Sequence, residues 1–268
     1  MSQGTYVLAD QATELDRLQL QSRVWEPAGR RLLAQIGDGT GTRVLDVGCG
    51  AMGWLRLLSE WVGPEGSVIG TDLDEKMLSA ADTFVTSQGL SNVALIEDDL
   101  FATDLDPGSF DLVHARFQLA PLGRAEEQMA TYLRLVRPGG TIIIEDVDPG
   151  SWHFLPPAPA IEERLIPLVA QAFETASDDP WVARRLPDLF HQAGIQPAVR
   201  AEVQALDPGH PYQRLPLQFA NALDGLLRTL VDTDELDEVL DEAASEIDEP
   251  GRWGLTFTLV QTWGHRPT

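Results

Sequence analysis

Cysteine is almost absent from this 268-residue chain, which has a single one, Cys49. One cysteine cannot form an intrachain disulfide, and it cannot build a cysteine-rich zinc site. Basic residues are also scarce, because 19 Lys and Arg stand against 42 Asp and Glu and leave a formal charge of −23. A surface this acidic repels phosphate backbones and anionic lipids, so we expect neither a nucleic-acid partner nor a membrane partner.

Two further absences concern where the protein resides. The chain has no run of about 18 apolar residues, so no segment is expected to span a membrane. The N-terminal stretch MSQGTYVLADQATELD lacks the basic and then apolar segments of a signal peptide, and we expect a cytoplasmic protein. Seven tryptophans and a hydrophobic content of 43% are enough for a sizeable core, so wholesale disorder is excluded.

The first half of the chain alternates between short apolar runs and segments of helical periodicity. The apolar runs predict strands at 43–47, 67–71, 92–97, 110–115 and 141–147. Helices are predicted among them at 54–62, 74–88 and 124–137. Such alternation is typical of an α/β fold, here a Rossmann-like, doubly wound and mostly parallel sheet with helices on both faces.

The flanking segments are less regular. Residues 11–36 form a predicted helix that Pro27 kinks or splits. After the fifth strand, the pattern predicts helices at 161–176, 181–193, 214–231 and 234–247, and strands at 198–206 and 255–263. Residues 148–180 and 207–250 are expected to be helical lid insertions, because they are rich in Trp, Phe, Leu and Pro.

The length leaves the number of domains open, since 268 residues at roughly 150 per domain give about 1.8. No internal repeat or flexible linker is visible, so we expect a single domain over residues 1–268. Its parts would be N-terminal helices at 1–40, a cofactor-binding core at 41–147, the two lids, and the remaining helix and strands at 181–206 and 251–268.

A glycine motif follows the first predicted strand. Gly48, Gly50 and Gly53 form a complete G-x-G-x-x-G between this strand and a helix, where backbone can approach a bound cofactor closely. The motif alone also fits a purely structural turn. Asp72 ends the next strand, where a carboxylate can bind both hydroxyls of a ribose.

Further acidic residues help to distinguish among cofactors. Asp46 lies two residues before the first glycine, where a dehydrogenase carries a small or apolar residue, and it can bind a charged amino group through water. The third strand ends in Glu97, Asp98 and Asp99, which suit the exocyclic amine of adenine. A ribose, an adenine and a cationic amino-acid tail are the parts of S-adenosylmethionine. A NAD-dependent dehydrogenase is the disfavoured alternative.

Four motifs, which together span about residues 40–148, carry a family resemblance. They are VLDVGCGAMG, VIGTDLDEKML, LIEDDLFATDLDPGSFDLVHARF and LRLVRPGGTIIIEDVD. In this order they resemble the class I S-adenosylmethionine-dependent methyltransferases, most of all the small-molecule branch related to ubiquinone and menaquinone C-methyltransferases. The resemblance implies S-adenosyl-L-methionine as cofactor and a seven-stranded sheet whose last strand, 255–263, is antiparallel.

The resemblance also implies roles for individual residues. The methionine end of the cofactor would lie against Asp46, Gly48, the Cys49 backbone and Gly50. The nucleoside end would contact Asp72 at the ribose, Leu73 at the adenine ring, and Asp98, Asp99 and the Leu100 amide at the adenine edge. Arg116 would lie beneath the methyl-bearing sulfonium. The segment 118–121 (QLAP) replaces the Leu-x-His-Leu segment common in this branch, so no catalytic histidine is expected in that loop.

Methyl transfer requires alignment of the acceptor more than a fixed catalytic constellation. A general base helps where the nucleophile is a hydroxyl or an acidic carbon. His153, after the fifth strand, is the candidate base, with an ordinary loop histidine as the alternative. His114 is expected to pack or to hydrogen-bond behind the site. Tyr6 and Gln21 are candidates to close over the cofactor, against plain surface or packing roles.

Several acids are expected to have no part in the chemistry. Glu145, Asp146 and Asp148 follow the fifth strand, but no second cluster supplies oxygen ligands, so solvated or capping positions and no metal are expected. The run from Asp232 to Glu249 is expected to form a helix with one apolar stripe and a solvated acidic face.

The lids are expected to enclose an apolar methyl acceptor. The candidate lining residues are Trp152, Phe154, Phe173, Trp181, Phe219 and Leu223. The substrate would be a small, largely apolar molecule, such as a polycyclic or polyketide-like natural-product intermediate, and its acceptor atom (O, N or C) stays open. The alternative function is that of a non-methylating member of the fold, which uses bound S-adenosylmethionine to assist a cyclisation or rearrangement. A homodimer is one candidate assembly.

Overall fold

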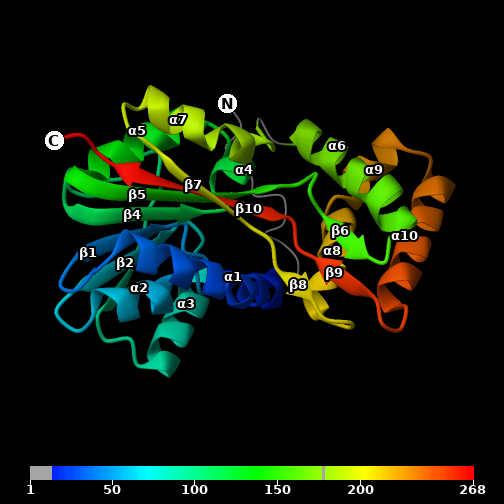
Figure 1. The fold of residues 1–268 in the computed structure, drawn as a ribbon, viewed down its shortest axis with the longest axis horizontal. Helices are drawn as coiled ribbons and strands as arrows, with labels where there is room; N and C mark the ends of the chain where they lie inside the picture. The colour runs from blue at the N-terminus through cyan, green and yellow to red at the C-terminus, as the bar shows by residue number, and fades with distance from the viewer. Residues whose placement is uncertain (1–13, 177–178) are drawn as a thin grey trace.

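A seven-stranded mixed sheet occupies one end of the computed structural model, which describes residues 14–176 and 179–268 (Figure 1). The strand order is β3-β2-β1-β4-β5-β10-β7, and β10 runs antiparallel to both of its neighbours while the other six strands share one direction. The strands are β1 (Arg43–Val47), β2 (Ser67–Asp72), β3 (Val93–Glu97), β4 (Phe110–Arg116), β5 (Val136–Asp148), β7 (Ala198–Glu202) and β10 (Thr258–His265). This sheet confirms the predicted fold class, including the antiparallel last strand.

The central strands are apolar because helices cover both of their faces. β1 is buried at four of its five residues and β4 at six of seven, whereas the edge strand β3 is largely exposed. The helices on one face are α1 (Glu14–Ile36), α2 (Leu55–Val62) and α3 (Glu75–Gln88), and those on the other are α4 (Leu119–Leu122), α5 (Ala125–Leu135) and α7 (Leu186–Gln192) (Figure 1). The predicted two-faced covering is therefore confirmed.

A second, mostly helical part lies beyond the carboxyl ends of the parallel strands (Figure 1). This part, called the lid below, consists of β6 (His153–Leu155), η1 (Ala160–Leu165), α6 (Ile166–Ala176), β8 (Ala205–Leu206), η3 (Pro211–Arg214), α8 (Leu215–Ala222), α9 (Asp224–Leu230), α10 (Thr233–Asp248) and β9 (Trp253–Leu255). Its strands form a small antiparallel sheet of order β6-β9-β8. The apolar core of the lid also takes in Trp25 and Ala28 of α1, so this helix packs against both parts. That sheet and lid form a single domain stays a prediction.

Some predicted elements differ from the observed ones. α1 is one helix through Pro27, so of the two predicted alternatives, a kink or a split at Pro27, the split is wrong. The predicted strands 198–206 and 255–263 are each divided between the two sheets, as β7 with β8 and as β9 with β10. The chain changes sheets at two paired points, because Thr256 N donates to the Gln204 carbonyl and Gln204 N donates to Thr256 Oγ1, each at 2.9 Å.

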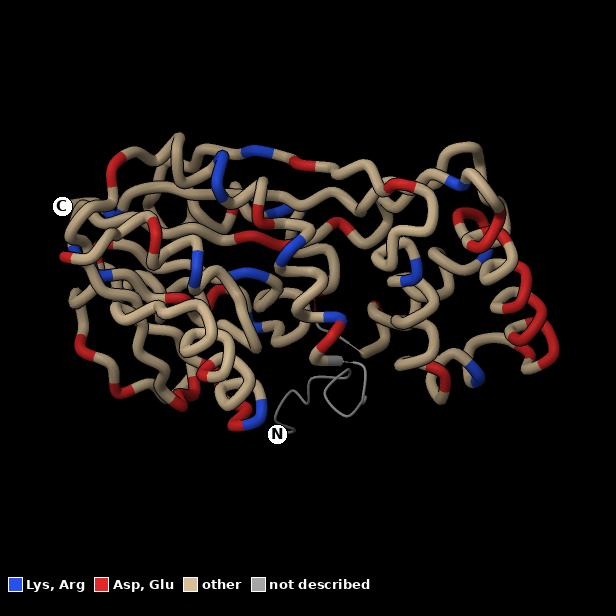
Figure 2. The backbone as a smooth tube through the Cα atoms, turned by 90° about the horizontal axis from the view of Figure 1, so that it is seen from below, with Lys and Arg blue, Asp and Glu red and all other residues tan. Residues whose placement is uncertain are grey.

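The acidic run forms α10 at the outer edge of the lid. Leu236, Val239 and Ile247 are buried on its inner side, while Figure 2 shows the acids along the outside, as predicted. The predicted helix 214–231 is divided at Leu223 into α8 and α9. The predicted helix 181–193 begins instead with a 3₁₀ turn, η2 (Val182–Arg185), before α7. Within the described ranges, no helix is both long and apolar enough to cross a membrane.

Candidate active site

The turn between β1 and α2 holds its three motif glycines in the left-handed backbone region. The φ angles of Gly48, Gly50 and Gly53 are 61°, 55° and 44°, which other residues rarely adopt. A Cβ atom on Gly48 would lie 2.1 Å from Nε2 of Gln118, and one on Gly53 would lie 2.6 Å from Oδ2 of Asp46. The strand, turn and helix that the motif predicts are all present, and the turn brings its backbone close to neighbouring groups.

Asp72 supports this turn from the end of β2. Its Oδ2 accepts a hydrogen bond from Gly50 N and its Oδ1 accepts one from Asp74 N, each at 2.9 Å. Burial raises the pKa of Asp72, and these amides partly offset the effect. The adjacent Leu73 is 63% exposed, so its side chain is accessible to a planar ring. The Cys49 side chain is buried at the turn, where burial raises the pKa of its thiol.

The acids predicted to border adenine lie just after β3. Asp98 N donates to the Asp72 carbonyl at 3.1 Å, which brings this loop beside the end of β2. Asp98 is half-buried, and this burial raises its pKa. Asp99 is exposed, and Leu100 is buried. Asp72, Leu73 and Asp99 thus lie at one edge of the sheet, and their contacts with a nucleoside stay a prediction.

A line of buried polar side chains crosses the sheet behind the glycine turn. His114 Nδ1 lies 2.7 Å from Asp46 Oδ1, and His114 Nε2 lies 3.1 Å from Glu145 Oε2. Gln261 Nε2 donates to Glu145 Oε1 at 2.5 Å. These four residues, called the buried network below, come from the adjacent strands β1, β4, β5 and β10, and none is more than 2% exposed.

The buried network favours a charged imidazole. Burial opposes the charge, but the carboxylates of Asp46 and Glu145 outweigh this effect and raise the pKa of His114. The ring stacks on Trp54 with centroids 3.9 Å apart, and the second oxygen of Asp46 accepts from Trp54 N at 2.9 Å. Asp46 therefore ties the first turn of α2 to His114. The predicted hydrogen-bonding role of His114 behind the site is confirmed.

Arg116 brings a buried cation next to this network. Its Nη2 donates to Ser22 Oγ of α1 at 3.2 Å, while its Nη1 is buried without a hydrogen-bond partner among the described residues. Burial lowers the pKa of Arg116, and the charges of Glu145 and Asp46 oppose this effect. A buried donor without a partner costs about 1–3 kcal/mol. The Nη1 atom is therefore suited to a ligand that carries an anionic or polar group.

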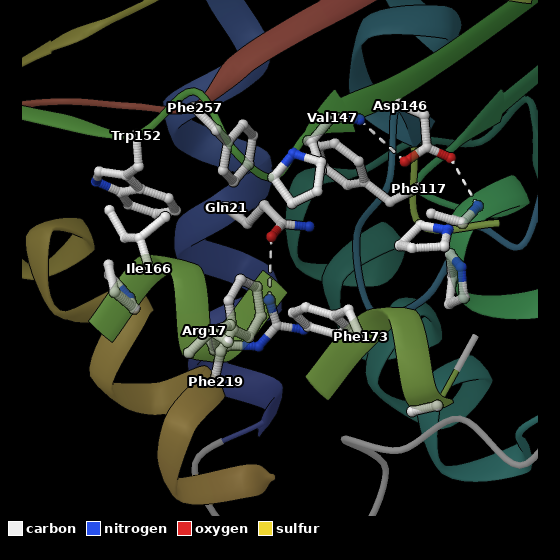
Figure 3. Close-up of a pocket in the computed structure, with 17 residues that line it drawn as sticks. Arg17, Gln21, Phe117, Asp146, Val147, Trp152, Ile166, Phe173, Phe219 and Phe257 are labelled. Carbon is white, nitrogen blue, oxygen red and sulfur yellow. Dashed lines mark hydrogen bonds between the residues drawn. The ribbon is translucent and has the colours of Figure 1, made fainter. Parts of the chain in front are cut away.

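A cavity lies between the edge of the sheet and the lid (Figure 3). The aromatic residues of its wall are Phe117, Trp152, Phe173, Phe219 and Phe257. Phe173 and Phe219 meet edge to face with centroids 5.4 Å apart, and Trp152 and Phe257 do so at 5.1 Å. The polar side chains of Arg17, Gln21 and Asp146 interrupt an otherwise apolar wall. Such a cavity suits a flat, largely apolar molecule with few polar groups.

Gln118 connects the glycine turn with the cavity. Its Nε2 donates to the Gly48 carbonyl at 3.2 Å, and its neighbour Phe117 and nearby Ala120 both line the cavity. Phe117 has a φ of 58°, and its N–H donates to the Glu145 carbonyl at 2.9 Å. The turn and the cavity therefore share one loop at the carboxyl edge of the sheet, which is where open α/β sheets bind ligands.

Half of the predicted lid residues line the cavity, namely Trp152, Phe173 and Phe219. Phe154 and Leu223 belong to the lid core instead, at 1% and 2% exposure. Trp181 lies outside the cavity wall, where its Nε1 donates to Glu174 Oε1 at 2.7 Å. Phe117, Phe257 and Arg17 were not predicted, because no local pattern indicates that these distant segments meet.

Of the residues predicted as a base or as contacts that close over the cofactor, Gln21 lines the cavity and His153 does not. His153 lies on β6 outside the cavity wall, with a side chain 61% exposed and Nδ1 3.9 Å from Glu162 Oε1. This position gives a base role for His153 no support. Gln21 lines the cavity and accepts from Arg17 Nη1 at 3.0 Å. Tyr6 lies outside the described residues.

The acids at the carboxyl end of β5 were expected in solvated or capping positions, and two of them are not solvated. Glu145 and Asp146 are each 1% exposed, because β10 and the lid cover this end of the strand. Glu145 belongs to the buried network, and Asp146 Oδ2 accepts from Ala120 N at 3.1 Å, which is a capping position at the start of α4. Asp148 forms an ion pair with Arg184. In the described part of the chain, no group of three His, Cys, Asp or Glu side chains is placed to hold a metal ion.

The strand order, the antiparallel β10 and the glycine turn define a class I S-adenosylmethionine-dependent methyltransferase. A family model described as a methyltransferase domain matches residues 38–204, and the chain belongs to this family. Its methyl donor is S-adenosyl-L-methionine, so the protein is an enzyme of the methyltransferase class. The dehydrogenase alternative is thereby excluded.

Relatives of known function and structure agree with this assignment. The chain is 32% identical over 181 residues to the aklanonic acid methyltransferase of Streptomyces sp. (strain C5). This alignment covers 67% of this chain and 79% of that protein. It is 27% identical over 176 residues to a demethylmenaquinone methyltransferase of Lactococcus lactis, with 62% and 70% covered. A putative methyltransferase from Bacillus halodurans C-125 has a similar fold at 16% identity, with a TM-score of 0.59 and 90% and 100% covered.

Proposed function

We propose that this enzyme methylates a small, flat and largely apolar molecule bound in the cavity of the lid. The observation that carries the proposal is the shared loop, in which Gln118 contacts the Gly48 carbonyl while Phe117 and Ala120 line the cavity. A cofactor on the glycine turn and an acceptor in the cavity would then face each other across this loop. The relatives named for aklanonic acid and for demethylmenaquinone support an acceptor of this size and character.

The residues around the turn fit the parts of the cofactor. Asp72 accepts amides at both oxygens, and a carboxylate accepts about four hydrogen bonds, so it can also bind ribose hydroxyls. Leu73 offers an exposed apolar face to adenine, beside Asp98 and Asp99. The unpartnered Nη1 of Arg116 suits the carboxylate of the amino-acid part. Asp46, in contrast, is only 2% exposed and is bound to His114 and the Trp54 amide, so it would act by holding the turn.

Methyl transfer requires that the acceptor be aligned with the methyl group and that water be excluded from the reacting atoms. Bound S-adenosylmethionine supplies an electrophilic methyl group for in-line displacement. The aromatic wall of the cavity would orient a planar acceptor and keep water away from the reacting atoms. The buried network would keep the turn rigid, because His114 ties Asp46 of β1 to Glu145 of β5.

Two measurements test this function. S-adenosylhomocysteine is expected to bind in a calorimetric titration, whereas NAD is not. Incubation with S-adenosylmethionine and a set of naphthols, naphthoquinols and hydroxyanthraquinones is expected to give products heavier by one methylene group in mass spectrometry. Binding of NAD in place of S-adenosylhomocysteine, or conversion of such an acceptor without a change in mass, would contradict the proposal.

A further inference from the structure

A single carboxylate, that of Asp146, is set in the wall of the lid cavity. Among the residues described along this wall, Asp146 is the only acid, and it is 1% exposed. The other polar groups, Arg17 and Gln21, come from α1, and Figure 3 shows them apart from Asp146 on β5. Burying a carboxylate beside an aromatic cavity is unfavourable unless hydrogen bonds compensate it. An apolar side chain at this position would avoid that cost.

Backbone amides hold the carboxylate in place but leave it able to accept one more donor. Asp146 Oδ1 accepts from Val147 N at 2.9 Å and Oδ2 accepts from Ala120 N at 3.1 Å (Figure 3), and the Leu119 amide also interacts with it. An ionised carboxylate has about four acceptor positions. Three of them accept from the amides of Val147, Ala120 and Leu119, so one remains for a hydroxyl of a molecule in the cavity.

The surroundings of Asp146 tune its affinity for a proton. Burial raises its pKa to about 6, with a further contribution from Asp179 and an opposing one from the backbone amides. Tyr132 of α5 faces it, Asp179 is itself paired with Arg185 of η2, and Arg17 lies on the α1 side of the cavity. α4 supplies no titratable group.

Asp148, two residues further along β5, shares the face of Asp146 and is paired with Arg184. Three other charged groups near this strand end face the other way. Neighbouring strand residues alternate between the two faces of a sheet, so Glu145 and its register partner Arg116 point away from Asp146. His114 hydrogen-bonds Glu145 and therefore lies on that opposite side as well. On β10, the register partner of Asp146 is the apolar Val260. Asp146 therefore titrates near neutral pH, and it does so independently of the buried network on the other face.

We propose that Asp146 is the general base of the reaction and that the methyl acceptor is an acidic hydroxyl, of a phenol or an enol, directed at this carboxylate. The inference rests on the proposed function, because it requires the acceptor to lie in the lid cavity. It replaces His153, which has no contact with the cavity, as the base. Ala120, whose N–H binds Asp146, lies two residues from Gln118, whose side chain binds Gly48, so the base and the glycine turn flank the same loop.

The step balances without a further reactant. As the hydroxyl oxygen of the acceptor approaches the methyl carbon, its proton passes to Asp146. The new bond joins oxygen to the methyl carbon, the bond from that carbon to sulfur breaks, and its electron pair stays on sulfur. The products are the methyl ether, S-adenosylhomocysteine and a protonated Asp146, which returns its proton to solvent. A carboxylate with a pKa near 6 is ionised at neutral pH and so is ready for this role.

The first test compares naphthol with methoxynaphthalene, which has the same ring without a hydroxyl proton. Wild-type protein saturated with S-adenosylhomocysteine is expected to bind naphthol at least about tenfold more tightly, because a hydrogen bond to a charged group is worth this much. The preference is expected to rise with pH through about 6, since only the ionised carboxylate accepts the proton. Asp146→Asn is expected to abolish both the preference and its pH dependence.

Asp148→Asn is the matched control, because Asp148 lies on the same strand but pairs with Arg184 outside the cavity wall. This variant is expected to keep the wild-type preference. Equal binding of the two probes by wild-type protein, a preference that survives in Asp146→Asn, or no binding of either probe would each overturn the inference. Calorimetric binding of S-adenosylhomocysteine to all three proteins separates such a result from failure of the proposed cofactor site.

Turnover gives the second readout. Wild-type protein and Asp148→Asn are expected to form naphthyl methyl ether from S-adenosylmethionine, and Asp146→Asn is expected to do so at least about 10²-fold more slowly, the usual range for loss of a general base. A merely structural role of Asp146 would instead lower the affinity for S-adenosylhomocysteine or the unfolding temperature. An Asp146→Asn variant that methylates at the wild-type rate would overturn the inference.

Discussion

The glycine turn and the lid cavity adjoin each other at the edge of the sheet, yet they are assembled in different ways. The turn is contiguous in sequence, and the polar residues that hold it come from neighbouring strands in fixed register. The cavity takes its wall from α1, from the loop after β4, from the end of β5, from both lid segments and from the junction of β9 with β10. Buried charge stabilises the first site, whereas packed aromatic rings form the second.

This difference implies that the two sites respond separately to substitution. Changes in the turn or its network should affect the free energy of unfolding and cofactor binding. Changes in the cavity wall should affect the acceptor alone, because its aromatic residues lie outside the buried network. Substitution of Gln118 should instead affect both cofactor and acceptor binding, because its loop is shared by the two sites.

The largest effect is expected for His114→Phe. The new ring can still stack on Trp54, but Asp46 and Glu145 lose the donor between them and remain as buried carboxylates. Breaking a buried ion pair at one partner costs about 3–5 kcal/mol, which chemical unfolding would measure. Arg214→Gln is the comparison in the lid, because Arg214 forms an exposed ion pair with Asp248, and it should cost less than about 1 kcal/mol. Similar losses in both variants would contradict the contrast.

The same histidine predicts a pH dependence. The pKa of His114 in the folded chain is raised above its usual 6.5, so the folded state holds the proton more tightly than the unfolded state. Its contribution to stability is complete below 6.5 and is lost as pH rises through the raised value. We expect the free energy of unfolding of the wild type to fall over this range and that of His114→Phe to lack this component. An identical pH dependence of the two proteins would count against a charged His114.

The next effect is expected for Gly48→Ala, with Gly63→Ala as its control. Both glycines have positive φ, 61° and 66°, so each variant should lose about 1–2 kcal/mol of stability through backbone strain. A Cβ on Gly48 also meets the Gln118 amide, whereas nothing lies within 4 Å of one on Gly63. Only Gly48→Ala should therefore lower the affinity for S-adenosylhomocysteine, by at least about tenfold, or about 1.4 kcal/mol. Equal cofactor affinity in the two variants would show that the close approach is not needed.

The contrast also explains what could be predicted from the sequence. The glycine turn, Asp72 and the alternation of strands with helices follow local patterns or their repetition along the chain, and the predicted fold class was correct. The antiparallel last strand was expected from family resemblance. The buried network was predicted only in part, because hydrogen bonding of His114 was expected but its partner Glu145 was expected in a solvated or capping position.

The cavity was the least predictable part. Phe154, Leu223 and Phe219 have the same composition signal, and only tertiary packing places the first two in the lid core and Phe219 in the cavity wall. The polar residue Arg17 comes from a helix that the sequence links to the cofactor rather than to the acceptor. Asp146 and Asp148 are two residues apart in the sequence. Only the three-dimensional structure shows that Asp146 lines the cavity while Asp148 forms an ion pair with Arg184.

A smaller effect is expected for Phe219→Ala in the cavity wall. Loss of this ring removes apolar surface and its edge-to-face contact with Phe173, so naphthol should bind about 1–2 kcal/mol more weakly by fluorescence titration. Trp181→Phe is the control, because Trp181 lies in the same region but outside the wall, and naphthol affinity should not change. An equal loss in both variants would place the acceptor elsewhere.

Calorimetric titration of S-adenosylhomocysteine into Asp72→Ala and Phe219→Ala tests the division between the two sites most directly. Asp72→Ala should weaken binding by about 1.5–3 kcal/mol, because a charge-assisted hydrogen bond and the support of Gly50 are lost together. Phe219→Ala should bind it as the wild type does. Unchanged affinity in Asp72→Ala, or an equal loss in Phe219→Ala, would contradict the assignment of cofactor to the glycine turn and acceptor to the lid.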